Sequence, residues 1–233
     1  MSRKRVLFVL TGHDRLGDGG DSQAAKTGFH LTETATPWCR LIDAGVDVVI
    51  TTPEGGPAKI DPSSRDDGPR DNRRFVAALG VTDGLDTTAA LGSLHPADFD
   101  GLYFPGGHGT MWDLPGHPVV SRFIDEMVGA EKLVAAICHG PAALVNQTNT
   151  RGSHWLSQRR ITAFTDSEEI ATGKATLMPF SLEQAIRRTG ASFVTAEDFS
   201  SCVVVDGPLI TGQNPASSAA LAAAMLIALQ SPD

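Results

Sequence analysis

Short apolar runs alternate with segments of helical periodicity along most of the chain. Apolar and β-branched residues predict strands at 5–10, 46–52, 101–107, 133–137 and 159–164, and a hairpin at 202–212. Helical spacing predicts helices over 33–44, 119–128, 140–145 and 179–189, and a last helix that Pro215 opens. Strands that alternate with helices in this way are typical of an α/β fold, in which a mostly parallel sheet carries helices on both faces.

Two segments interrupt this alternation. Residues 53–74 are polar and rich in turn-forming residues, which predicts an extended surface excursion without a core of its own. Residues 13–30 are rich in glycine and charge and directly follow the first strand, where α/β folds place their ligand loops. The chain has no internal repeat and no linker-like tract, so we expect residues 1–233 to form a single domain.

Composition narrows the possible partners and the compartment. The net charge of -8 argues against a nucleic acid or an anionic membrane as partner, because neither attracts an acidic protein. The longest apolar stretch, near the C-terminus, is too short to span a bilayer, and the N-terminus lacks a cleavage site for secretion. Three scattered cysteines, Cys39, Cys138 and Cys202, form neither a disulfide framework nor a zinc cluster. We therefore expect a cytoplasmic protein.

The stretch VAAICHGPAALV, residues 134–145, is the first candidate for chemistry. A predicted strand runs directly into Cys138, and a predicted helix begins within a few residues. This order is typical of a nucleophile elbow, a tight turn that exposes a nucleophile at the carboxyl edge of a sheet. Nearby N–H groups and the helix terminus would favour the thiolate over the thiol. The alternative is an inert buried cysteine, because free cysteines are usually of that kind.

A second candidate, FPGGHG, follows another predicted strand. Paired glycines allow backbone N–H groups to approach a substrate oxygen, so the amides of Gly107 and His139 could form an oxyanion hole, with Gly106 and His108 beside it. The alternative is a glycine turn with a solvated His108.

Acidic residues near strand ends are more ambiguous. Glu33 lies in a first helical turn, where a glutamate usually serves the helix dipole, although a proton-transfer carboxylate would look the same in sequence. Glu168 and Glu169 could orient His139 as the acid of a Cys–His–acid triad, or Asp166 could cap a helix with both glutamates in its first turn. No two histidines have the i, i+4 spacing of a metal site on one helix, so we expect no metal.

These segments together resemble the ThiJ/PfpI superfamily, relatives of the class I glutamine amidotransferases. The resemblance covers nearly the whole chain and runs in order through KTGFHLTE, LYFPGGHGTMWDLP, VAAICHGPAAL, ITAFTDSEE, MPFSLE and VVVDGPLITGQNPAS. It is closest to the branch that contains the HchA-type chaperones and the glyoxalase III enzymes. The chain departs from that branch at EDFSSC, before the VVVDG strand. The resemblance implies a flavodoxin-like three-layer sandwich with a nucleophile elbow.

The resemblance also implies roles for single residues. Cys138 matches the nucleophile, His139 the histidine that follows it, and Glu33 the glutamate that handles protons at the thiol. Glu169 most nearly matches the acid partner of the histidine, with Glu168 as an adjacent competitor. Gly107 matches an oxyanion-hole position, and a homodimer is implied. Residues 202–233 contain neither histidine nor glutamate, which disfavours amidotransferase chemistry.

The function implied is a glyoxalase III, a lyase of the D-lactate dehydratase type, which needs no glutathione, cofactor or metal. Such an enzyme converts methylglyoxal or glyoxal, which are small reactive aldehydes, to a hydroxy acid through a hemithioacetal on the cysteine. The alternatives are a stress-response chaperone, an oxidation sensor that uses Cys138, a protein or nucleotide deglycase, and a peptidase. All of these would use the same nucleophile, so the sequence leaves them open.

Overall fold

The computed structural model describes residues 3–17, 23–66, 68–148 and 152–230. Its main sheet has eight strands in the order β3-β4-β2-β1-β5-β6-β10-β9. Their bounds are β1 Arg5–Val9, β2 Asp47–Thr52, β3 Gly56–Lys59, β4 Gly84–Ala90, β5 Gly101–Phe104, β6 Leu133–Ile137, β9 Val203–Asp206 and β10 Leu209–Gly212. The six inner strands are parallel, and the two edge strands, β3 and β9, are antiparallel to their neighbours.

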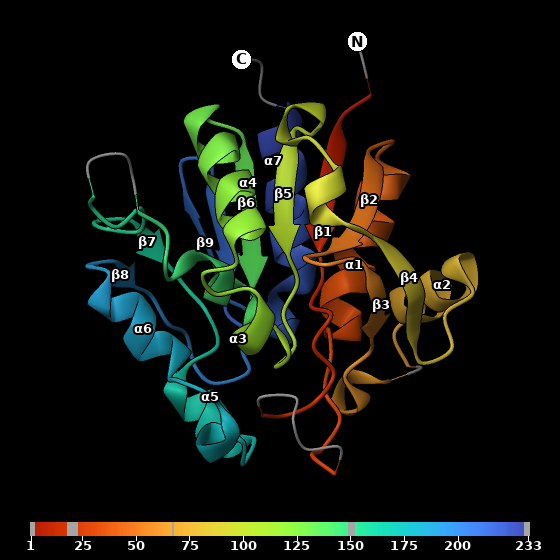
Figure 1. The fold of residues 1–233 in the computed structure, drawn as a ribbon, viewed down its shortest axis with the longest axis horizontal. Helices are drawn as coiled ribbons and strands as arrows, with labels where there is room; N and C mark the ends of the chain where they lie inside the picture. Colours follow the sequence, from red (N-terminus) through yellow and green to blue (C-terminus); the bar gives the residue numbers. More distant parts are fainter. Residues whose placement is uncertain (1–2, 18–22, 67, 149–151, 231–233) are drawn as a thin grey trace.

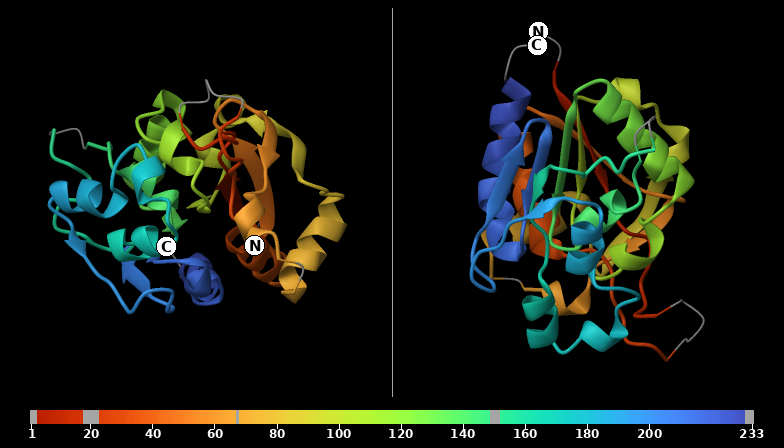
Figure 2. Two further views of the ribbon diagram at one scale, coloured as in Figure 1. Left: turned by 90° about the horizontal axis from the view of Figure 1, so that it is seen from below. Right: turned by 90° about the vertical axis from the view of Figure 1, so that its left-hand side faces the viewer.

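Helices cover both faces of this sheet (Figures 1 and 2). Their bounds are α1 Leu31–Asp43, α2 Arg70–Leu79, α3 Thr110–Asp113, α4 Pro118–Gly129, α5 Asp166–Ala171, α6 Leu182–Arg188 and α7 Ser218–Gln230. The right-hand view of Figure 2 shows α7 and α1 on one side of the sheet and α4 on the other. The expected three-layer α/β architecture is confirmed. Within the described ranges no helix is both long and apolar enough to cross a bilayer.

Alternation along the central strand β1 produces the two cores. Leu7 and Val9 face α4 and pack in the cluster that contains Phe123. Val6 and Phe8 face the opposite way and pack with residues of α1 and α7, among them Leu221. Because a strand directs successive side chains to opposite faces, a continuous apolar run is what a strand buried between two helical layers requires.

The segment 53–74 corrects the sequence-based expectation of a surface excursion. It contains β3, the side chains of Ala58 and Ile60 are buried in a core cluster, and α2 begins at Arg70. Neither α2 nor β4 was predicted. The sequence of α2 is amphipathic but mostly polar in its first half, and only Asn72 and Phe75 of it are buried, which made it easy to take for part of a surface segment. The strand β4 shows no regular alternation of buried residues.

Several predicted bounds were too long. The strand expected at 159–164 is only β7, Arg160–Ile161, which pairs with β8, Ser192–Phe193, outside the main sheet. The helix expected at 140–145 is a 3-10 turn over Gly140–Leu144. The helix expected to open at Pro179 begins at Leu182, because the Ser181 hydroxyl caps it by accepting from the Gln184 N–H. The hairpin at 202–212 is confirmed as β9 and β10.

Candidate active site

Cys138 stands at a strained turn directly after β6. Its φ of 59° lies in the left-handed region, which costs a non-glycine residue about 1–2 kcal/mol and marks functional positions. The Cys138 N–H donates to the Gly212 carbonyl of β10, and the Cys138 carbonyl accepts from the Phe164 N–H, both at 2.9 Å. These bonds hold the turn from two sides, so the thiol stays at the carboxyl edge of the sheet.

Glycines make room for this turn. A Cβ on Gly106 would lie 2.5 Å from Glu33 Oε2 and 2.7 Å from the Cys138 Cβ, and one on Gly140 would lie 2.1 Å from the Phe104 carbonyl oxygen. These distances are shorter than real Cβ contacts, so the chain needs glycine at both positions. The GG pair and the CHG triplet thus follow from how closely β5, β6 and α1 approach one another.

Glu33 is fully buried beside the thiol. Its Oε2 accepts from the Gly106 N–H, outside α1, at 2.9 Å. The helix-dipole interpretation of this residue therefore does not describe where its carboxyl lies. Burial raises the pKa of Glu33 to about 8, even though the Cys138 side chain and the Gly106 amide favour the charged form.

The Cys138 thiol is also buried, with 3% of its surface exposed. Burial raises the pKa of Cys138 well above its ordinary value, and the charge of Glu33 and a hydrogen bond to it raise it further. The expectation that a helix terminus favours the thiolate is therefore corrected. The turn after Cys138 is a single short 3-10 segment, and its dipole does not outweigh burial and the neighbouring carboxylate.

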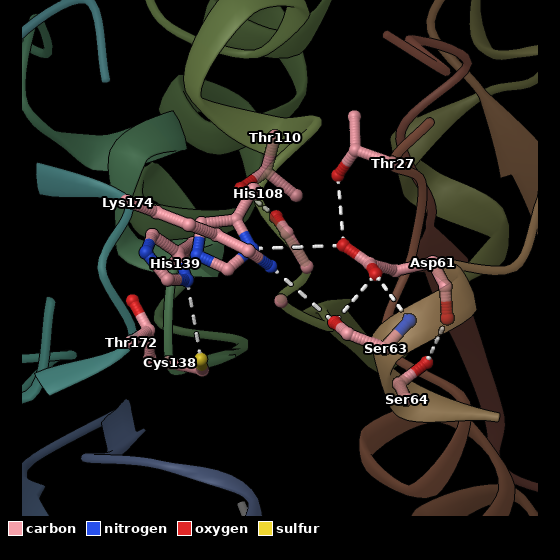
Figure 3. Close-up of polar contacts among 12 residues, drawn as sticks. Thr27, Asp61, Ser63, Ser64, His108, Thr110, Cys138, His139, Thr172 and Lys174 are labelled. Carbon is pink, nitrogen blue, oxygen red and sulfur yellow. Dashed lines mark hydrogen bonds and ion pairs between the residues drawn. The ribbon is translucent and has the colours of Figure 1, made fainter. Parts of the chain in front are cut away.

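His139 links the thiol to an acid. Its Nδ1 lies 3.2 Å from the Cys138 Sγ, and its Nε2 lies 2.6 Å from Glu169 Oε2 on α5 (Figure 3 shows the first of these contacts). Burial lowers the pKa of His139, and the neighbouring His108 lowers it further, while Glu169 acts in the opposite direction. The pKa of Glu169 is well below its usual range, because its bonds to His108 and His139 outweigh the effect of burial.

Glu168 does not compete for His139. It forms a capping box with Thr165 at the start of α5, and its Oε1 accepts from the Asn214 amide at 2.7 Å and the Phe199 N–H at 2.8 Å. Thr165, and not Asp166, caps this helix; Asp166 instead accepts from the Ser181 hydroxyl. The geometry therefore brings Glu169 to the histidine and leaves Glu168 as a buried structural carboxylate.

The glycine pair, Gly106 and Gly107, lies next to Glu33 and Cys138. Gly106 donates to Glu33, and Gly107 lines the pocket that contains Cys138. Among the hydrogen bonds of the described residues, neither the Gly107 amide nor the His139 amide has an acceptor. Both N–H groups expected to form an oxyanion hole are thus available to a ligand.

His108, expected beside the oxyanion hole or, alternatively, in solvent, is not solvated. It is buried, its ring centroid lies 4.3 Å from that of His139, and its Nε2 lies 3.0 Å from Glu169 Oε1. On its other side Nδ1 lies 3.6 Å from Asp61 Oδ2 and 3.4 Å from Lys174 Nζ (Figure 3). Burial lowers the pKa of His108, but bonds to Asp61 and Glu169 outweigh this, so the pKa is raised overall.

Sequence reasoning missed Asp61, Lys174 and His30. The first follows β3 in the segment expected at the surface, and its only signal was the apolar alternation of Ala58 and Ile60 just before it. His30 precedes α1, and its buried Nδ1 has no hydrogen-bond partner in the described structure. Burial lowers the pKa of His30 to about 4.

A pocket of about 310 Å³ reaches the Cys138 thiol, and His30, Asp61, His108, His139 and Lys174 are among its lining residues, whereas Glu33 and Glu169 lie behind them. Its apolar wall is formed by Phe164 and Phe199, and its polar wall by the histidines and Lys174. A larger groove of about 1060 Å³ lies along α7 and the β9–β10 hairpin, but none of the residues above lines it. We therefore take the smaller pocket as the candidate active site.

Three possible metal ligands meet in this pocket. His108, His139 and Glu169 each offer a ligand atom, and these atoms lie within 4.8 Å of one another. They come from three different segments of the chain, so the absence of an i, i+4 histidine pair does not bear on them. Each is already hydrogen-bonded to another member of the group, and the nearby Lys174 ammonium opposes a further cation.

The fold and this site define a class of protein: a mostly parallel α/β sheet in which an inner strand, β6, leads into a cysteine in the left-handed conformation, with a histidine next in the chain and a buried glutamate beside the thiol. The model of the DJ-1/PfpI family matches residues 24–228. The chain belongs to the DJ-1/PfpI family, which confirms the resemblance read from its motifs.

Individual relatives agree with this assignment. The glutathione-independent glyoxalase hsp3101 of Schizosaccharomyces pombe is 29% identical over 227 residues, which cover 88% of this chain and 89% of that protein. The Rapid Encystment Protein 24 KDa (REP24) of Francisella tularensis has a TM-score of 0.91 and 31% identity, over 98% of this chain and 100% of that chain. Glyoxalase III of Candida albicans has a TM-score of 0.85 and 24% identity over 97% of both chains, which confirms the flavodoxin-like fold.

Proposed function

We propose that this protein is a glutathione-independent glyoxalase of the glyoxalase III type, which converts methylglyoxal and water to D-lactate without a cofactor. The observation that carries the proposal is that the Cys138 thiol neighbours two groups able to transfer protons, the His139 imidazole and the Glu33 carboxyl. Similarity to a glyoxalase over 88% of the chain supports the same activity.

The first step is attack on the aldehyde. Because the pKa of the Cys138 thiol is raised, a resting thiolate is scarce, and the neutral His139 accepts the thiol proton at Nδ1 as the sulfur attacks. The S–C1 bond forms, and the carbonyl electron pair moves to the aldehyde oxygen. The amides of Gly107 and His139 would stabilise this oxyanion, which takes up the proton to give a hemithioacetal.

The second step moves hydrogen from C1 to C2. The Glu33 carboxylate removes the C1 proton to form an enediolate, and the proton of the C1 hydroxyl moves to the C2 oxygen. The resulting Glu33 carboxylic acid returns a proton to C2, which leaves a lactate thioester. A pKa of about 8 places Glu33 near the working pH, so that both of its forms are accessible in one cycle. Water then cleaves the S–C1 bond, which releases lactate and restores the thiol.

The same geometry disfavours an oxidation sensor. Redox-sensing thiols are acidic and accessible, whereas Cys138 is buried and its pKa is raised. The chaperone, deglycase and peptidase alternatives use the same nucleophile, so only assays with their different substrates distinguish them from a glyoxalase. A homodimer and a cytoplasmic location stay predictions.

The test is an assay of the purified, reduced protein for methylglyoxal loss and D-lactate gain without glutathione or added metal. Wild type should produce D-lactate in step with methylglyoxal loss, and Cys138→Ser should produce none. Cys202→Ser is the matched control. In the described structure the hydrogen bonds of Cys202 use its backbone N–H and carbonyl and not its thiol, and it does not line the pocket. Absence of D-lactate from folded wild type would contradict the proposal, as would full turnover by Cys138→Ser.

A further inference from the structure

One carboxylate serves two imidazoles in this site. Glu169 Oε2 lies 2.6 Å from His139 Nε2, and Glu169 Oε1 lies 3.0 Å from His108 Nε2. An ionised carboxylate only accepts hydrogen bonds, so both Nε2 atoms carry hydrogen. If His139 is neutral, its other nitrogen, Nδ1, is then a lone pair that faces the Cys138 thiol.

Asp61 is a second carboxylate, and it lies next to His108 but makes no contact with His139 among the described hydrogen bonds and ion pairs. Asp61 Oδ2 lies 3.6 Å from His108 Nδ1 and accepts from the Thr27 hydroxyl at 2.8 Å. Asp61 Oδ1 accepts from the Ser63 N–H at 2.9 Å and from the Ser63 hydroxyl at 2.6 Å (Figure 3). These bonds fix the buried Asp61 carboxylate. His108 therefore lies between two carboxylates, whereas His139 has one carboxylate and a thiol.

We propose that Asp61 and His108 are positioning residues: the His108 imidazolium, held between Asp61 and Glu169, fixes the Glu169 carboxylate and keeps His139 as a neutral base toward Cys138. The raised pKa of His108 and the lowered pKa of His139 agree with this division. Two adjacent titratable groups whose environments separate their protonation states are a recurring feature of acid–base catalysis. The inference rests on the proposed function only in assigning His139 the role of base.

This role differs from the oxyanion or substrate contact expected for His108. Its Nε2 faces Glu169, and its Nδ1 faces Asp61 and the Lys174 ammonium, so neither ring nitrogen is free for a substrate oxygen. The remaining charged groups around His139 are accounted for in the same way. Lys174, after α5, lowers the pKa of both His139 and His108, but at His108 the bonds to Asp61 and Glu169 outweigh it. His30, just before α1, interacts with His139. The pKa of Glu33, next to the thiol, is raised to about 8 by burial, so its carboxylic acid is the major form at neutral pH and its carboxylate the minor one.

The test measures the protonation of His139 directly. Imidazole nitrogen NMR would follow the His139 titration in wild type, Asp61→Asn and His108→Asn. Loss of the His108 charge removes a repulsion from His139, and loss of Asp61 lets His108 become neutral, so both variants should raise the midpoint, by roughly one pH unit. The acid limb of kcat/KM for methylglyoxal should move to higher pH by the same amount.

A double variant distinguishes this mechanism from independent effects. Asp61 acts through the charge on His108, so Asp61→Asn with His108→Asn should shift the midpoint no further than His108→Asn alone. Glu54→Gln is the matched control, because Glu54 also forms a histidine–carboxylate pair, 2.7 Å from His117 Nε2, but on the surface away from the pocket. It should leave the His139 midpoint unchanged.

Each outcome has one meaning. Unchanged His139 midpoints in folded Asp61→Asn and His108→Asn would overturn the proposal, even if methylglyoxal is turned over, because a structural role alone changes stability without moving this titration. If wild type makes no lactate, the proposed function fails, but the NMR midpoints and the pH profile of Cys138 alkylation by iodoacetamide still test the positioning role. Partial restoration of the midpoint by Asp61→Glu would support it further.

Discussion

Glu168 and Glu169 are adjacent in the chain, yet their carboxylates lie in different parts of the molecule. Glu168 turns back into the first turn of α5 and across to Asn214, while Glu169 faces the His139 imidazole at 2.6 Å. Successive residues of a helix point about 100° apart, so α5, which Thr165 caps, necessarily separates these two side chains. One start site therefore assigns a structural role to one glutamate and an active-site position to the other.

This separation predicts opposite phenotypes. Glu168→Gln should lower the free energy of unfolding by about 1–3 kcal/mol, because buried donors lose a charged acceptor, and should leave kcat nearly unchanged. Glu169→Gln should lower kcat/KM by roughly 10²-fold or more, because an amide cannot hold two N–H donors as a carboxylate does, with a small change in stability. Denaturant unfolding and steady-state kinetics on both variants would check this. Equal losses of activity would contradict it.

Gly106→Ala should abolish activity. The added methyl group would lie 2.5 Å from Glu33 Oε2 and 2.7 Å from the Cys138 Cβ, so the buried carboxyl and the nucleophile would have to separate. Gly129→Ala, in α4, has open space at the same methyl position and should be neutral or stabilise the fold by about 0.5–1 kcal/mol. Thermal melting and D-lactate production would compare the pair. An active Gly106→Ala enzyme would show that this close approach is not needed.

The pH dependence of stability should reveal the buried Glu33. Its folded pKa of about 8 lies above its ordinary value of 4.5, so the folded state binds the proton more tightly. The resulting stability is fully present below pH 4.5 and is lost as the pH rises through about 8. Glu33→Gln cannot ionise and should melt at a higher temperature than wild type at pH 8.5, with a smaller difference at pH 5. An equal difference in melting temperature between Glu33→Gln and wild type at the two pH values would contradict this prediction.

Glu33 should also keep the Cys138 thiol protonated and therefore less reactive. Its charge and its hydrogen bond raise the pKa of Cys138, so Glu33→Gln should lower that pKa and speed alkylation of Cys138 by iodoacetamide at pH 8. Methylglyoxal turnover should nevertheless fall, because the amide cannot carry a proton from C1 to C2. Alkylation followed by intact mass, together with the lactate assay, would show that Cys138 reacts faster with iodoacetamide while methylglyoxal is turned over more slowly. A concurrent decrease of both rates would mean that Glu33 acts only as a structural support.

The parts of the site that sequence could predict are those at the ends of apolar strands. Cys138 follows β6 and Gly106 follows β5, and both strands are buried runs whose carboxyl ends share one edge of the sheet. Glu33 was ambiguous because its sequence position suits a helix dipole equally well. Its actual partner, the Gly106 amide, is 73 residues away and leaves no trace in the local pattern.

Asp61 and Lys174 could not be predicted in this way. Asp61 lies among proline and serine residues that are typical of an exposed turn, and it is buried only because Thr27, Ser63 and His108 surround it in space. Lys174 follows α5 in a polar segment, and its nearest polar neighbours are His108 and Ser63, from other parts of the chain. Periodicity reports which residues face a core, and a polar network assembled from loops has no periodicity.

The β3–β4 pair at the edge of the sheet gives the chemistry a dependence on local opening. Edge elements can detach at a lower free-energy cost than the centre of a sheet, and release of β3 would withdraw Asp61 from His108 while β6 still held Cys138. At low denaturant the protein should therefore change its pH optimum before it loses its helical circular dichroism. The edge of this sheet would then tune a reaction whose nucleophile follows one of its inner strands.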